Sequence, residues 1–224
     1  MTPAPGAALG TVLGVWAHPD DEAYLSSGLM AQAAAAGSLP PERWPPETLA
    51  GVHTAELERC LSMLGVREHI FLGPPDVDWH TPPPDAGADA PIMEQVVPDT
   101  VLTFGPDGIT NHEGHKSVSH WATEAFREHA PSGASLYYAA DPRAWGAEFL
   151  PDLFALGAFR DGAGPPVHDD EELYLDLDSD LLDLKAAAIR EHHSQIVGLA
   201  TAFGEERWTR AMARKSFRRA ERKN

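Results

Sequence analysis

Thr11–Ala17 (Thr-Val-Leu-Gly-Val-Trp-Ala) is a short apolar run with β-branched residues, and His18–Glu22 (His-Pro-Asp-Asp-Glu) follows it directly. A run of this length and composition predicts a strand buried on both faces of a sheet. Residues 22–36, rich in Ala and Leu, predict a helix that stops at Gly37. A buried strand that leads into a helix is the first unit of an α/β sheet.

The rest of the chain continues this alternation of strands and helices. Further strands are expected at His69–Leu72, Thr100–Phe104, Ser135–Ala139 and Glu172–Asp178. Further helices are expected at Glu47–Leu64, Glu113–His129, Ala144–Leu156, Leu181–Ala200 and Glu205–Arg219. This order predicts an α/β fold with a doubly wound, mostly parallel sheet and helices on both faces. We expect one domain over residues 1–224, with a basic C-terminal helix at about 205–224.

Two loops depart from a regular alternation. The Pro-rich loop Ser38–Pro46 joins two helices with no strand between them, although a crossover needs only one helix. A strand is therefore absent here, either truly deleted after Gly37 or omitted from the sequence given. The loop Gly73–Pro91 carries six prolines, and its Trp79 and His80 are candidates for the mouth of a substrate site or for loop decoration alone.

Composition and charge exclude several classes of function. The 224 residues carry a net charge of -17, which opposes binding to nucleic acid. Eight basic side chains lie in residues 205–224, and they suit a solvated helix against an acidic body better than a phosphate or membrane anchor. No run of about 18 apolar residues predicts a membrane span, and no secretory signal is expected. The single cysteine, Cys60, excludes an internal disulfide, favours the cytoplasm and suits core filling within its helix.

Chemistry concentrates where the first strand ends, because His18, Asp20, Asp21 and Glu22 follow it within five residues. Ligands of open α/β sheets bind at this carboxyl edge. His18 and Asp21 can face one ion, which leaves Asp20 for proton transfer. The alternative is that Asp20 or Asp21 only caps the helix that follows.

A second cluster, Thr110–His115 (Thr-Asn-His-Glu-Gly-His), follows the expected strand Thr100–Phe104 and lies at the same edge. His112 and His115 are three residues apart and share a helix face. Taken alone, they would suit a pair of surface histidines on a polar turn.

Two histidines and one aspartate around an ion with an open position are typical of a catalytic zinc site, whose bound water has a pKa of about 7. We assign His18, Asp21 and His115 as ligands. Asp20 then accepts the proton of the attacking water. His112 stabilises the oxyanion or protonates the leaving amine.

Ala-His-Pro-Asp-Asp-Glu at 17–22, with His-x-x-His at 112–115, resembles the LmbE-like, or PIG-L, family of metal-dependent deacetylases. The resemblance runs from about Gly10 to Phe217. It implies a Rossmann-like zinc (Zn2+) hydrolase that removes acetyl from N-acetylglucosamine-type amides, as in mycothiol and bacillithiol biosynthesis; ferrous iron (Fe2+) uses similar ligands. It implies the same ligands and the same roles for Asp20 and His112. His192 matches the histidine of a His-x-Ser-Gln run common near the carboxyl end of members.

Three departures from the family pattern affect the details. Gly114 stands where members carry an aspartate that orients the first histidine of the second motif, a strand is missing after the first helix, and the loop near Pro75-Asp76 lacks the usual glycines. The sequence therefore also allows a catalytically silent, metal-bearing scaffold protein, or an amidase of mycothiol-type conjugates. We expect a small acetamido-sugar or amide substrate, no nucleic-acid partner and a possible homo-oligomer.

Overall fold

The computed structural model describes residues 9–27, 49–66, 68–72, 89–156, 164–170 and 172–220. The end of the first helix, the Gly37–Ser38 junction, the loop Ser38–Pro46 and the side chains of Trp79 and His80 lie outside these residues. The chain forms two compact units. The first unit includes residues 18–70 and 175–215, and the second includes residues 9–17, 71–174 and 216–224.

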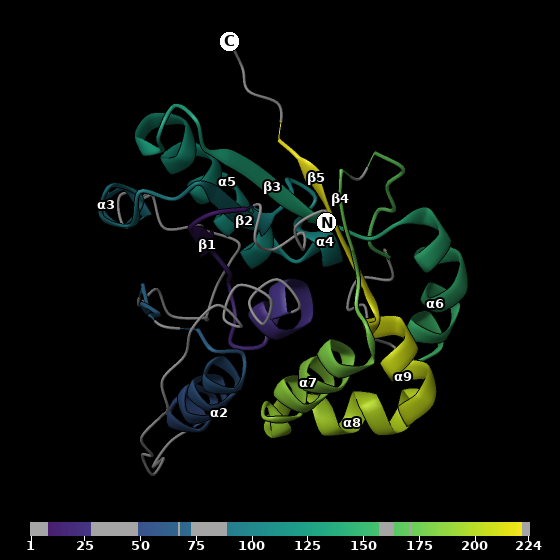
Figure 1. Ribbon diagram of the computed structural model, residues 1–224. Coiled ribbons are helices and arrows are strands. Elements are labelled where there is room, and N and C mark those ends of the chain that lie inside the picture. Colours follow the sequence, from purple (N-terminus) through teal and green to yellow (C-terminus); the bar gives the residue numbers. More distant parts are fainter. Residues whose placement is uncertain are drawn as a thin grey trace. The chain divides into compact units, whose positions relative to one another are not determined.

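The sheet has the strand order β1-β2-β3-β5-β4, and Figure 1 labels its strands. The strands are β1 (Val12–Gly14), β2 (Thr100–Phe104), β3 (Ser135–Ala140), β4 (Leu173–Asp176) and β5 (Arg214–Arg219). Strands β1, β2 and β3 are parallel, and β5 runs antiparallel to β3. All five residues of β2 are buried. The predicted α/β class with a mostly parallel sheet is confirmed.

The helices of the second unit include α3 (Asp89–Val96), α4 (Gly108–Asn111), α5 (Glu113–His129) and α6 (Arg143–Ala155). The amphipathic helix α5 contacts β2 and α3 and keeps its predicted bounds, whereas α3 and α4 have no counterpart in the sequence prediction. The first unit contains the π-helix η2 (Glu22–Ser26), α2 (Leu49–Met63), α7 (Ser179–Arg190), α8 (His193–Phe203) and α9 (Glu205–Met212). No helix of the described residues is long and apolar enough to cross a membrane.

Strand β1 lies at an end of the sheet formed by the described residues, and the prediction that it is buried on both faces is wrong. Val12 and Leu13 are half-buried, and Gly14 is exposed. The predicted strand at His69–Leu72 is also wrong, since these residues adopt no regular secondary structure and are exposed. A four-residue apolar run forms a strand only where a neighbouring strand supplies ladder hydrogen bonds, and its sequence alone does not reveal that.

The predicted helix Leu181–Ala200 is two helices, α7 and α8, separated at Glu191 and His192. Two residues of helix α2 contact the residues on either side of this break. Glu56 of α2 accepts hydrogen bonds from the backbone N–H (2.9 Å) and the hydroxyl (2.6 Å) of Ser194, and Arg59 pairs with Glu191 at 2.7 Å. A backbone N–H group at the start of α8 therefore donates to a carboxylate that is distant in sequence, and no local sequence pattern predicts such a contact.

The predicted basic helix Glu205–Arg219 is also wrong beyond Met212, because residues 214–219 form strand β5. Phe217 is fully buried, and the Ser216 hydroxyl donates to the Ala140 carbonyl of β3 at 2.8 Å. The run of charges favours a solvated helix, but pairing with β3 and burial of Phe217 override it.

We predict that Phe217→Ala lowers the free energy of unfolding by about 3–5 kcal/mol, because it leaves a cavity in the core beside β3. Arg219→Ala, at an exposed position of the same strand, is the matched control and is expected to change stability by at most about 0.5 kcal/mol. Urea denaturation of both variants measures the difference. Equal effects at the two positions would contradict the assignment of Phe217 to the core.

Asp89, the first residue of α3, makes stability depend on pH. Burial raises the pKa of its carboxyl from 3.8 to about 6. The folded state therefore holds this proton more tightly than the unfolded chain, and stability falls as the pH rises from about 4 to about 6. We expect Asp89→Asn to raise the free energy of unfolding by roughly 2–3 kcal/mol at pH 7.5 and to give no such gain at pH 3.5. Denaturation at both pH values tests this, and a gain independent of pH would contradict it.

Candidate active site

The turn before η2 brings His18 and Asp21 together in the first unit. The Asp21 carboxylate accepts a hydrogen bond from the His18 backbone N–H at 2.8 Å, and the same oxygen lies 3.4 Å from Nδ1 of His18. Asp21 makes no capping hydrogen bond to η2, so the helix-cap alternative is wrong for this residue. Two predicted ligands thus lie on the same side of one turn.

Asp20 is held in an unusual backbone conformation between them. Its φ of 148° is rare for a residue with a side chain. Its carbonyl accepts hydrogen bonds from the N–H groups of Ala23 (3.0 Å) and Tyr24 (3.1 Å). Desolvation, then the charges of Asp21 and Glu22, raise the pKa of the Asp20 carboxyl to about 8. A carboxyl whose pKa is raised is a stronger base than an ordinary aspartate, which suits a group that accepts and returns a proton.

His115, at the start of α5 in the second unit, has the tautomer that a metal ligand needs. Its Nδ1 lies 2.8 Å from the Gly108 carbonyl oxygen and 3.1 Å from the Thr110 hydroxyl. Because a carbonyl only accepts, Nδ1 carries the proton, and Nε2 carries a lone pair. The ring is buried and stacks on Phe104 with centroids 4.1 Å apart.

His112 has the opposite tautomer, although its ring centroid lies only 5.0 Å from that of His115. Its Nδ1 accepts a hydrogen bond from the Gly114 backbone N–H at 3.1 Å. The proton of the neutral ring therefore sits on Nε2, which makes His112 a donor there. The backbone of Gly114 thus orients His112, where the family pattern led us to expect an aspartate side chain.

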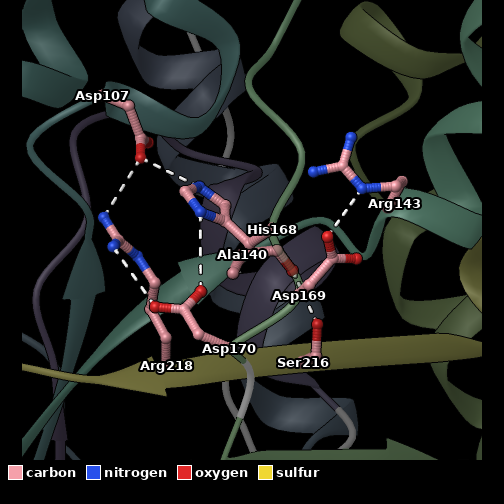
Figure 2. A network of polar contacts seen from close by, with 8 residues as sticks. All are labelled: Asp107, Ala140, Arg143, His168, Asp169, Asp170, Ser216 and Arg218. Carbon is pink, nitrogen blue, oxygen red and sulfur yellow. Dashed lines mark hydrogen bonds and ion pairs between the residues drawn. The ribbon is translucent and has the colours of Figure 1, made fainter.

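The loop that carries the Gly108 carbonyl is strained and is held by Asp107. Gly108 and Ile109 have φ values of 71° and 53°, and the second is rare for a β-branched residue. One Asp107 oxygen accepts from the Ile109 N–H at 2.8 Å. The other accepts from Nε2 of His168 at 3.1 Å and from the Arg218 guanidinium at 3.3 Å (Figure 2).

Asp107, His168 and Arg218 were missed by the sequence analysis. His168 and Arg218 lie 61 and 111 residues beyond Asp107 in the sequence, and no sequence motif includes all three. Their network fixes the turn that selects the His115 tautomer. The structure thus pairs His18 with Asp21 in the first unit and His112 with His115 in the second, and their union around one ion belongs to the proposal below.

Comparison with known proteins agrees with the sequence motifs. The model of the family "PIG-L: GlcNAc-PI de-N-acetylase" matches residues 13–126, about half of the chain. The 1D-myo-inositol 2-acetamido-2-deoxy-alpha-D-glucopyranoside deacetylase of Kineococcus radiotolerans is 28% identical over 83% of this chain and 68% of its own length. The protein of the same name from Acidothermus cellulolyticus is 28% identical over 83% of this chain and 80% of its own length.

The fold has a close counterpart among solved structures. N,N'-diacetylchitobiose deacetylase from Pyrococcus horikoshii superposes with a TM-score of 0.61 at 16% identity, over 98% of this chain and 87% of that one. At this identity the likeness concerns the fold. The motif at residues 17–22, the second histidine pair and the family match together show that this chain belongs to the PIG-L (LmbE-like) family.

Proposed function

We propose that the protein is a metal-dependent hydrolase that removes the acetyl group from an N-acetylated amino sugar of the N-acetylglucosamine type. The observation that carries the proposal is the pair of hydrogen bonds at Nδ1 of His112 and Nδ1 of His115, because they imply a proton at Nε2 of the first ring and a lone pair at Nε2 of the second. The names of the relatives support an acetamido sugar as substrate.

The donor set fits zinc. His18, Asp21 and His115 would hold the ion through two imidazole nitrogens and one carboxylate oxygen, a set typical of catalytic zinc and also accepted by ferrous iron. The proton on Nδ1 of His115 supports this fit, since it leaves Nε2 able to coordinate. When bound, the ion would supply Lewis acidity and lower the pKa of a water molecule.

Two side chains, Asp20 and His112, then have separate roles in the reaction. Asp20 accepts the proton of the attacking water as the new C–O bond forms. His112, as a neutral ring, donates a hydrogen bond from Nε2 to the oxygen that gains negative charge, and the proton that Asp20 accepted passes to the nitrogen as the C–N bond breaks. The products are acetate and a free amino sugar, so one water is consumed for each bond cleaved.

The silent-scaffold alternative rested partly on Gly114, and the hydrogen bond from its backbone to His112 removes that argument. An amidase of mycothiol-type conjugates would cut the same kind of bond and differs only in the amide it accepts.

The test is acetate release from a panel of zinc-loaded reactions: N-acetylglucosamine, its inositol glycoside, N,N'-diacetylchitobiose and a thiol-conjugate amide. We expect release from at least one glucosamine-type substrate. One equivalent of bound zinc with no hydrolysis across the panel would contradict the proposal and favour the scaffold.

A further inference from the structure

Glu22 is a buried carboxylate that joins three parts of the first unit. One oxygen, Oε2, accepts a hydrogen bond from the Asp20 backbone N–H at 3.0 Å. The other, Oε1, lies 2.9 Å from Nε2 of His192 and 3.4 Å from Sγ of Cys60. Glu22 is 4% exposed, and His192 and Cys60 are fully buried. The group that holds the backbone of Asp20 is thus itself held by residues far along the chain.

His192 acts on Glu22 as a hydrogen-bond donor. Its Nδ1 makes no hydrogen bond with any residue that the structure describes. Because a buried N–H without an acceptor is costly, the proton of a neutral ring belongs on Nε2, where Glu22 accepts it. An apolar side chain would fill the same space without leaving a polar atom unsatisfied. Packing alone therefore does not explain a histidine here.

Cys60 completes the set as a weaker donor. Burial, then the Glu22 carboxylate, raise the pKa of the Cys60 thiol, so the thiol keeps its proton and points it at Oε1. His192 lies at the break between α7 and α8. On one side of the break the Ser194 N–H donates a hydrogen bond to Glu56, and on the other side Glu191 forms an ion pair with Arg59. Contacts between α2 and the α7–α8 break thus place His192 against Glu22.

We propose that His192 is a positioning residue that, through Glu22, holds the strained backbone of Asp20 and so aims its carboxylate at the reacting water. The proposal rests on the proposed function. Without the donor from His192, Glu22 is free to turn away from the Asp20 N–H, and Asp20 loses a contact that keeps φ at 148°. The change removes no group from the predicted ligands His18, Asp21 and His115.

His192→Leu, which removes the donor, tests the proposal against His192→Gln, whose amide N–H reaches about as far as Nε2. We expect His192→Leu to lower kcat for acetate release by about 10–100-fold, with KM and zinc affinity within about threefold of wild type. His192→Gln should recover kcat to within about threefold. His193→Leu, at the exposed neighbouring position, is the matched control and should leave kcat unchanged.

Amide hydrogen exchange of residues 17–23 supplies a readout that needs no activity. It should be about tenfold faster in His192→Leu than in wild type and normal in His192→Gln. If wild type deacetylates no substrate, the proposed function fails, while this readout still decides whether His192 holds Asp20. Should His192→Leu not fold, Glu22→Gln is expected to give the same loss of kcat and the same faster exchange, because its amide cannot accept from all three donors.

Several results would overturn the proposal. One is a folded His192→Leu with wild-type kcat or wild-type exchange. Another is His192→Gln as impaired as His192→Leu. The ligand atoms of Glu22, Cys60 and His192 also lie within 4.8 Å of one another, close enough to hold a cation. Two zinc equivalents in wild type, one of them lost in Cys60→Ser, would make this cluster a metal site instead.

Discussion

Asp20→Asn is expected to lower kcat for acetate release by about 1,000-fold while zinc affinity stays within about threefold of wild type. The amide keeps the size of the carboxylate but cannot accept a proton from the attacking water, and loss of a general base typically costs 100- to 10,000-fold. Asparagine is also nearly isosteric with aspartate, so the substitution adds no bulk at a position whose φ is 148°. Steady-state kinetics and zinc titration measure the two quantities.

Asp180→Asn is the matched control, since Asp180 is an exposed aspartate at the start of α7 in the same unit. It should leave both quantities at wild-type values. Full activity of Asp20→Asn would refute its role as the base. A parallel loss of zinc would instead make Asp20 a ligand.

His115→Ala is expected to weaken zinc binding at least about 100-fold and to reduce acetate release to background. Removing a ligand should cost more than the 10- to 100-fold typical of groups that only support ligands. His120→Ala, an exposed histidine on the same helix α5, is the control and should bind zinc as wild type does. Isothermal titration with zinc at fixed pH measures the affinities.

His112→Ala separates the two histidines of the second motif. Because its Nε2 carries the proton, its loss should lower kcat and leave zinc affinity nearly unchanged. Zinc affinity lost in His112→Ala and kept in His115→Ala would reverse the tautomer assignment.

Elements that depend on local pattern were predictable from the sequence. The bounds of β2 and α5 agree with the prediction because one is a continuous apolar run and the other an amphipathic helix. The α7–α8 break and β5 were not predictable. The first depends on contacts to α2, and the second depends on burial of Phe217 and pairing with β3. Charge and helical propensity argued for the wrong structure at both places.

The residue types of the candidate site could be read from the sequence, whereas the contacts that hold those residues could not. The run at residues 17–22 and the histidines at 112 and 115 indicated the chemistry because those groups are adjacent in sequence. The contacts that set their states are distant or involve backbone atoms. One example is the contact between the Gly108 carbonyl and Nδ1 of His115. Another is the hydrogen bond between Glu22 and His192, two residues that are 170 positions apart. Such contacts appear only once the chain has folded.

The most direct test of the account is to remove metal from the protein, return zinc stepwise, and measure acetate and free amine together with a glucosamine-type N-acetyl substrate. We predict no turnover in the metal-free protein, a linear rise to a maximum at one zinc per chain, and acetate and amine in equal amounts. Turnover that persists after the metal is removed, or zinc binding without release of either product, would contradict the proposed metal-dependent deacetylation.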